Sequence, residues 1–153
     1  MPLFPLFAKK PLIPDADSAM IVEAIRGAEL KTSGEIRVYI ESHCKFVDPL
    51  DRAAEVFYSL KMEATENRNA VLVYVAIKDK QLALFADEGI YKKAGEKFWK
   101  DAVQVMLRHF NASNYGHGIS YVVTETGNTL KDHFPYDRNT DKNELPDDIV
   151  FGK

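Results

Sequence analysis

The order of hydrophobic and polar positions along the chain predicts helices that alternate with strands. Apolar residues recur at the three- and four-residue spacing of one helix face in several stretches, and polar residues fill the positions between them. This spacing predicts helices over residues 17–31, 49–62, 90–110 and 116–133. In the second of these helices, Leu50 and Phe57 are among the residues expected to face inward.

Three other stretches have the pattern of strands. Residues 35–41 alternate strictly, because Ile36 and Val38 fall on one face and Arg37 on the other. Residues 70–77 form the most apolar run in the chain, which is typical of a central strand buried on both faces. The turn after that run predicts that residues 81–85 return as the second strand of a hairpin.

The resulting order, α-β-α-β-β-α-α, predicts an α/β protein built as a three-layer α/β/α sandwich around a small mixed sheet of about four strands. We expect an apolar N-terminal arm over residues 1–14, one domain over residues 15–135 and an acidic tail over residues 136–153 that packs back on the domain. Either the arm or the tail could add an edge strand to the sheet.

Composition narrows the classes of partner. The chain has 153 residues, 46% of them hydrophobic and 28% charged, which suits one globular domain with a buried core. Its net charge of −3 argues against a nucleic-acid-binding surface. Cys44 is the only cysteine, so an intrachain disulfide is excluded and a free thiol is expected. The apolar start is too short for a membrane span and lacks the features of a signal peptide, so we expect no membrane insertion and a cytoplasmic protein.

The candidate chemistry is that of oxygen ligands. The sequence contains no phosphate-binding loop, nucleophile elbow or zinc-binding pair of histidines at standard spacing. Acidic residues instead gather in three predicted loops, at Asp48 and Asp51, at Asp87 and Glu88, and in the tail. Hard divalent cations are held by such carboxylates together with backbone carbonyl groups. Asp48 also has a plain structural explanation as a helix N-cap, and Asp51 as a first-turn acid.

Four short segments resemble the TPM domain in their order and spacing. They are Thr32-Ser33-Gly34-Glu35-Ile36-Arg37-Val38, Arg68-Asn69-Ala70-Val71-Leu72, Ala86-Asp87-Glu88-Gly89-Ile90 and Asn114-Tyr115-Gly116-His117-Gly118-Ile119. The tail segment over residues 141–147 resembles the bacterial branch in which this domain stands alone without a membrane anchor.

The resemblance implies an α/β/α sandwich and a divalent metal bound near the exit of the hairpin. Calcium is the expected ion, with magnesium or zinc as alternatives. Asp87 is the first expected ligand because it occupies the family's Gly-Asp-x-Gly-Ile position, and Asp48, Asp51 and Glu88 follow. Ala86 and Ala70 replace two glycines of the family pattern, so the loop must differ here if those glycines adopt positive φ.

Three functions follow from these patterns. The first is a metal-binding regulatory or interaction module without catalysis, acting with an unknown protein partner. The second is a metal-assisted phosphatase, in which Asp87 serves as ligand or nucleophile and Arg68 clamps the phosphate. The third is an interaction domain that makes contact through the apolar arm, residues 3–7.

Overall fold

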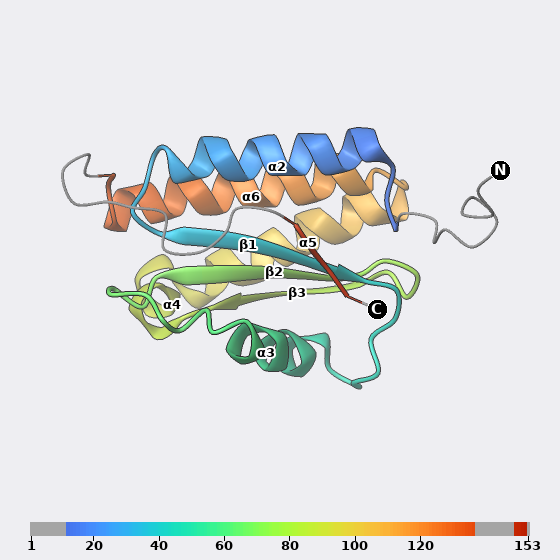
Figure 1. Cartoon of the computed structure of the whole chain (residues 1–153), viewed down its shortest axis with the longest axis horizontal. Helices are drawn as coiled ribbons and strands as arrows, with labels where there is room; N and C mark the ends of the chain where they lie inside the picture. The colour runs from blue at the N-terminus through green and yellow to red at the C-terminus, as the bar shows by residue number, and fades with distance from the viewer. Residues whose placement is uncertain (1–11, 137–148, 153) are drawn as a thin grey trace, which may run out of the picture.

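The computed structural model describes residues 12–136 and 149–152. Helices and strands alternate along the chain much as the hydrophobic pattern predicts, and Figure 1 shows them packed around one sheet. The elements are α2 (Asp15–Glu29), β1 (Glu35–Glu41), α3 (Pro49–Ser59), β2 (Ala70–Ala76), β3 (Gln81–Ala86), α4 (Glu88–Ala94), α5 (Glu96–Asn111), α6 (Tyr115–His133) and β4 (Val150–Phe151).

The sheet has four strands in the order β3-β2-β1-β4, which confirms the predicted small mixed sheet. β1 pairs in parallel with both β2 and β4, whereas β2 and β3 form the antiparallel hairpin. The fourth strand comes from the tail, one of the two sources that the sequence allows. β2 is buried along its whole length, as expected for a central strand covered on both faces.

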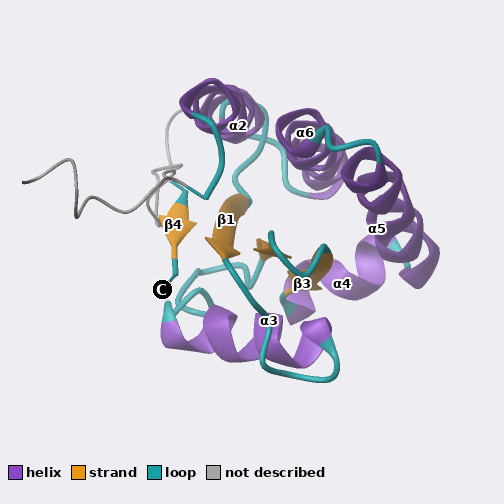
Figure 2. Cartoon of the chain, turned by 90° about the vertical axis from the view of Figure 1, so that its right-hand side faces the viewer, coloured by secondary structure: helices purple, strands orange, loops and turns teal. Residues whose placement is uncertain are grey.

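Helices cover both faces of the sheet, so the fold is the predicted three-layer sandwich. α2, α5 and α6 lie on one face and α3 lies on the other (Figures 1 and 2). Because side chains of a strand alternate between faces, the core divides into two clusters. Val71, Val73 and Val75 of β2 point toward α2, α5 and α6, and Leu72 and Tyr74 point toward α3.

Two local expectations are corrected. The single helix predicted over residues 90–110 is two helices, because Gly95 adopts a φ of 90° between them and no helix continues through that conformation. Leu50, expected to face inward, is 45% exposed because it lies in the first turn of α3, beyond the part of the helix that packs on the sheet.

The substitutions of alanine for glycine at residues 70 and 86 cause no strain. Both alanines lie in strands, and neither is among the described residues with positive φ. The predicted arm and most of the acidic tail lie outside the described residues, so the domain boundaries stay a prediction. Among the described helices, none is long and apolar enough to cross a membrane.

Candidate functional site

Asp87 lies at the junction where β3 ends and α4 begins. Its backbone N–H donates to the Ala70 carbonyl oxygen at 2.9 Å, which completes the pairing with β2. Its side chain caps α4, since Oδ1 accepts a hydrogen bond from the Glu88 N–H at 2.8 Å. The residue is only 2% exposed. A carboxylate buried this deeply requires a positive partner.

Arg68 is that partner, and it also reaches the neighbouring acid. Its Nε donates to Asp87 Oδ2 at 2.7 Å and its Nη2 to Asp87 Oδ1 at 2.9 Å, a bidentate pair. Its Nη1 lies 2.8 Å from Glu88 Oε1. The hydrogen bond to Asp87 raises the pKa of Arg68 above its usual value. The structure therefore brings two of the predicted ligands, Asp87 and Glu88, together around one cationic group.

The loop that carries Arg68 lies directly against the start of α4. The Gly89 N–H donates to the Arg68 carbonyl oxygen at 2.8 Å. A Cβ atom at Gly89 would lie 2.1 Å from the Asn67 carbonyl oxygen, so this approach requires a residue without a side chain. Arg68 itself has a φ of 51°, which places its side chain across the junction. The backbone carbonyl groups of residues 67 and 68 thus lie against the start of α4.

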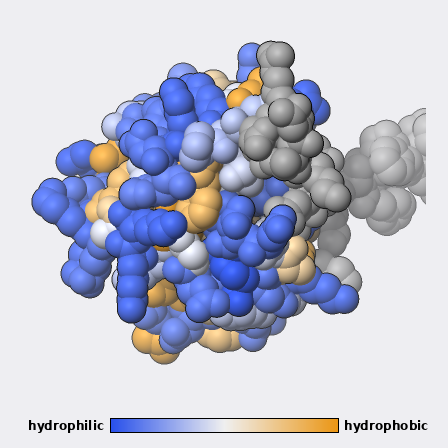
Figure 3. Space-filling view, turned by 90° about the vertical axis from the view of Figure 1, so that its left-hand side faces the viewer, coloured by the Kyte–Doolittle hydropathy of each residue, from blue (hydrophilic) through white to orange (hydrophobic). Residues whose placement is uncertain are grey.

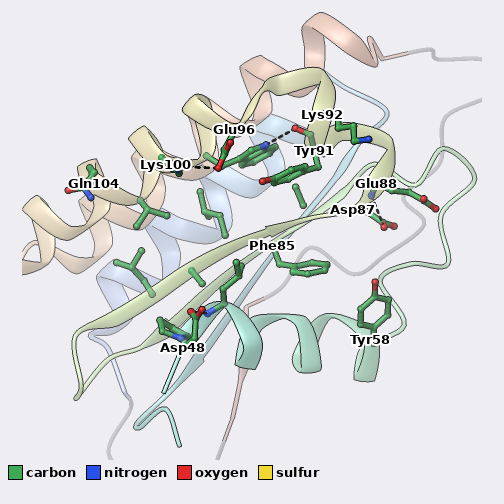
Figure 4. Close-up of a pocket in the computed structure, with 18 of the residues that line it drawn as sticks. Asp48, Tyr58, Phe85, Asp87, Glu88, Tyr91, Lys92, Glu96, Lys100 and Gln104 are labelled. Carbon is green, nitrogen blue, oxygen red and sulfur yellow. Dashed lines mark hydrogen bonds and ion pairs between the residues drawn. The ribbon is translucent and has the colours of Figure 1, made fainter. Parts of the chain in front are cut away.

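Asp48 and Asp51 lie at the other end of α3. Asp48 is the N-cap of this helix, with Oδ1 accepting from the Leu50 N–H at 2.9 Å. The opposite end of the helix packs near the β3 exit, where the rings of Phe57 and Phe85 lie 4.7 Å apart. α3 is roughly 15 Å long. Figure 4 shows Asp48 and Asp87 at opposite ends of the strand, so one ion cannot bind both without movement of the helix.

The donor set for a cation is therefore small within the described residues. The part of the chain that the structure describes contains no group of three or more acidic, histidine or cysteine side chains that could hold a metal ion. The acids of the tail, at residues 137–148, lie outside that part. The oxygen chemistry of Asp87 and Glu88 suits a hard cation, but Arg68 now occupies the position between them.

A groove of about 910 Å³ runs along β3 from Asp48 to Glu88, and we call it the β3 groove. Its floor is the strand itself, residues 82–86. One wall comes from α3 and the other from α4 and α5 (Figure 4). The α3 wall is apolar, with Pro49, Leu50 and Tyr58, whereas the wall from α4 and α5 combines the apolar Tyr91, Trp99 and Val103 with the polar Lys92, Glu96, Lys100 and Gln104. Figure 3, which faces the side where α4 lies, shows hydrophobic side chains gathered between hydrophilic ones.

A second polar cluster lies under α3, and the sequence analysis missed it. The carboxylate of Glu41, at the end of β1, accepts hydrogen bonds from Arg52 Nε and Nη2, both at 2.9 Å, and from the Tyr74 hydroxyl. Burial raises the pKa of Glu41, but the hydrogen bonds from Arg52 and Tyr74 outweigh it, and the net pKa is lowered. Burial, with the hydrogen bond to Glu41, raises the pKa of Tyr74. The only signal in the sequence was an acid inside an apolar strand pattern.

The predicted free thiol is confirmed, since Cys44 forms no disulfide. His43 does not activate it, because the His43 Nδ1 lies 2.8 Å from Asp79 Oδ1 instead. Asp79 also accepts from the Cys44 N–H at 2.7 Å. This pair ties the loop after β1 to the hairpin turn.

Comparisons with known proteins agree with this fold. The chain is similar to the BA42 protein of the psychrophilic bacterium Bizionia argentinensis, with 36% identity, 94% of this chain and 97% of that chain covered, and a TM-score of 0.85. The N-terminal domain of cg2496 from Corynebacterium glutamicum shares the fold at 12% identity, with 77% and 74% of the two chains covered and a TM-score of 0.57. No curated protein matches the chain. The family model of the TPM domain matches residues 8–129, and the chain therefore belongs to the TPM domain family.

Proposed function

We propose that this TPM domain is a non-catalytic module that binds a divalent cation, with Ca²⁺ preferred over Mg²⁺ and Zn²⁺, between Asp87 and Glu88. The observation that supports the proposal is the convergence of these two carboxylates on one cationic group, the Arg68 guanidinium, at 2.7–2.9 Å. An arrangement of this kind favours positive charge at a single point. Ca²⁺ is the best match because all of the available ligands are oxygen atoms and the loop geometry is irregular.

The proposal requires Arg68 to leave when the ion binds. The Arg68 side chain is 38% exposed, so it can turn toward water without opening the core. Glu88 is 71% exposed and free to move with the ion. Two carboxylates leave most of the coordination sphere to backbone carbonyl oxygens and water, so we expect weak binding, with a Kd on the order of 10⁻⁴–10⁻³ M. Ion binding would then change the loop over residues 65–69 and the start of α4, which is the basis for a regulatory role.

Titration of the full chain with CaCl₂, MgCl₂ and ZnCl₂, followed by calorimetry and backbone amide NMR, tests this proposal. We expect Asp87→Asn to weaken Ca²⁺ binding at least tenfold. Asp101→Asn makes the same chemical change at an exposed ion pair on α5 and serves as the control. Absence of heat and of shifted amide signals near Asp87 at 10-fold the expected Kd, or binding that survives Asp87→Asn, would overturn the proposal.

Arg68→Ala gives a sharper test, because competition and structural support predict opposite results. If the guanidinium competes with the ion, its removal strengthens Ca²⁺ binding severalfold. If Arg68 only shapes the loop, its removal weakens binding or leaves it unchanged. Asp48→Asn and Asp51→Asn test the remaining predicted ligands, and we expect neither to alter the binding that depends on Asp87.

The alternative is a metal-assisted phosphatase, in which Asp87 would serve as ligand or nucleophile. The predicted phosphate clamp, Arg68, has its Nε and Nη2 atoms on Asp87 and its Nη1 atom on Glu88, so it would have to exchange both partners for a phosphate. This favours the non-catalytic reading. Hydrolysis of p-nitrophenyl phosphate by the wild type, lost in Asp87→Asn, would support the phosphatase instead.

A further inference from the structure

β3 is an edge strand with one side of its backbone directed outward. It stands at the end of the sheet order, and among residues 12–136 and 149–152 it pairs with β2 alone. The Asp87 N–H points to β2, where it bonds to Ala70. Because backbone groups alternate in direction along a strand, the N–H and C=O groups of Phe85 and Ala83 also point to β2. The N–H and C=O groups of Leu82, Leu84 and Ala86 therefore point to the open edge, along the floor of the β3 groove.

The walls of the groove rise on both sides of this edge. α3 brings Leu50 and Tyr58 over one face of the sheet, and α5 brings Trp99 and Val103 over the other. A strand added to β3 would extend the sheet into the groove, with α3 above one of its faces and α5 above the other. Apolar side chains on both faces of such a strand would contact Leu50 and Tyr58 on one side and Trp99 and Val103 on the other.

We propose that the β3 groove binds residues 3–7 of a second copy of this chain as an added strand, and that two copies exchange these arms. The segment Leu-Phe-Pro-Leu-Phe is apolar on both faces of a strand, which matches the apolar residues of both walls. The proposal is independent of cation binding at Asp87.

Proline sets the register. Proline lacks an N–H group and is tolerated in a strand only where that position faces outward. The backbone nitrogen of Pro5 must therefore face away from β3, and the backbone groups of Phe4 and Leu6 then pair with β3. In this register the outer edge of the added strand lacks a donor at its centre, Pro5, which disfavours further growth of the sheet. The groove is lined by charges of both signs, Asp48, Asp87, Glu88 and Glu96 together with Arg68, Lys92 and Lys100, so charge does not fix the direction of the added strand.

The arm of the same copy has little chain to spare for this contact. Leu12 and Ile13 pack with the cluster under α2, and α2 lies over β1 and β4, the side of the sheet away from β3 (Figure 2). From Phe7 to Leu12 the chain spans at most about 18 Å. The four strands are about 14 Å across, so most of that length is used before an arm of the same copy lies along β3. A second copy has no such limit.

Sedimentation equilibrium of the full chain tests for the dimer. We expect the weight-average mass to rise roughly twofold with concentration in the wild type. The double variant Phe4→Asp, Leu6→Asp should stay monomeric. Leu30→Asp makes the same kind of change at a residue that is 72% exposed and far from the groove, and it should dimerise as the wild type does. Ala86→Pro, which removes an outward N–H and no bond to β2, should also abolish the dimer.

An intermolecular NMR experiment identifies the occupant of the groove. An unlabelled chain with Cys44→Ser and a nitroxide at Ala8→Cys is mixed with ¹⁵N-labelled wild-type chain. We expect broadening of the amide signals of residues 82–86, and its loss when the spin-labelled chain also carries Leu6→Asp. If Ala86→Pro unfolds the protein, this experiment alone decides the case.

Each other outcome overturns the proposal. A monomer at every concentration excludes arm exchange. This holds even if the arm then covers the groove of its own copy. A dimer that survives Phe4→Asp, Leu6→Asp has its interface elsewhere. Unchanged amide signals in residues 82–86 leave the groove to a different partner. None of these results bears on Ca²⁺ binding, so the two proposals fail separately.

Discussion

Replacement of Gly89 by alanine perturbs the close approach that holds the β3 exit together. Gly89 is the second residue of α4, and a Cβ atom there would lie 2.1 Å from the Asn67 carbonyl oxygen and 2.5 Å from that of Arg68. Ordinary contact between these atoms requires more than 3 Å, so the loop must move by about 1 Å. Both obstacles are backbone atoms that cannot turn aside, and the movement also stretches the hydrogen bond from Gly89 to Arg68.

The magnitude follows from these contacts. Overpacking against a fixed backbone costs about 1–3 kcal/mol, and a weakened hydrogen bond costs about 0.5–1.5 kcal/mol. The higher helix propensity of alanine offsets at most about 1 kcal/mol. We expect Gly89→Ala to lower the free energy of unfolding by about 1–3 kcal/mol, which corresponds to a fall in Tm of roughly 2–12 °C for a chain of this size.

Gly27→Ala is the matched control, because it makes the same substitution in a helix with open space around it. A Cβ atom at Gly27 has no heavy atom within 4 Å, so only the gain in helix propensity remains, about 0.5–1 kcal/mol. Thermal unfolding monitored by circular dichroism should therefore shift in opposite directions for the two variants. A Gly89→Ala variant as stable as Gly27→Ala would refute the close approach at the β3 exit.

Two further predictions concern the α3 side of the sheet. Glu41→Gln should lower the free energy of unfolding by about 1–3 kcal/mol at pH 7. Because folding lowers the pKa of Glu41, the stabilisation by its carboxylate is present above pH 4.5 and is lost as the pH falls below that value. In urea denaturation, the difference in unfolding free energy between the variant and the wild type should therefore be smaller at pH 3 than at pH 7. Phe57→Ala should cost about 3–5 kcal/mol in the same assay, because this fully buried ring fills the space between α3 and Phe85.

The elements that local pattern determines were predicted well. β1 was expected over residues 35–41 and is found at Glu35–Glu41. Strict alternation of apolar and polar residues is a local signal that predicts a strand directly. The break at Gly95 was not predicted, because a single glycine in a helical pattern is compatible with both a continuous helix and a break. Tertiary packing decided it: Trp99, one turn into α5, donates its indole N–H to the Tyr91 carbonyl oxygen of α4.

The site was predictable only in part. The family motif pointed to Asp87, but its bidentate pairing with Arg68 was not predicted, because the sequence does not show which carboxylate the arginine reaches. Asp48 and Asp51 were expected as ligands after Asp87, but spacing along the chain does not say which end of α3 meets the β3 exit. The β3 groove could not be predicted from local pattern at all, because it depends on how far α3 and α5 stand from the edge of the sheet.

The two edges of the sheet differ in a way that has a measurable consequence. β4 has two paired residues and is too short to recruit another chain. β3 has six residues, Gln-Leu-Ala-Leu-Phe-Ala, without a charge or a proline. A strand of this composition with an open edge is a template for aggregation unless something covers it. If the arm covers it, Phe4→Asp, Leu6→Asp should increase light scattering during prolonged incubation near Tm, even though it adds charge. Ala86→Pro in that background should suppress the increase, because the edge then lacks a donor at its end. Equal scattering by all of these variants would mean that the β3 edge recruits no strand, from the arm or from any other chain.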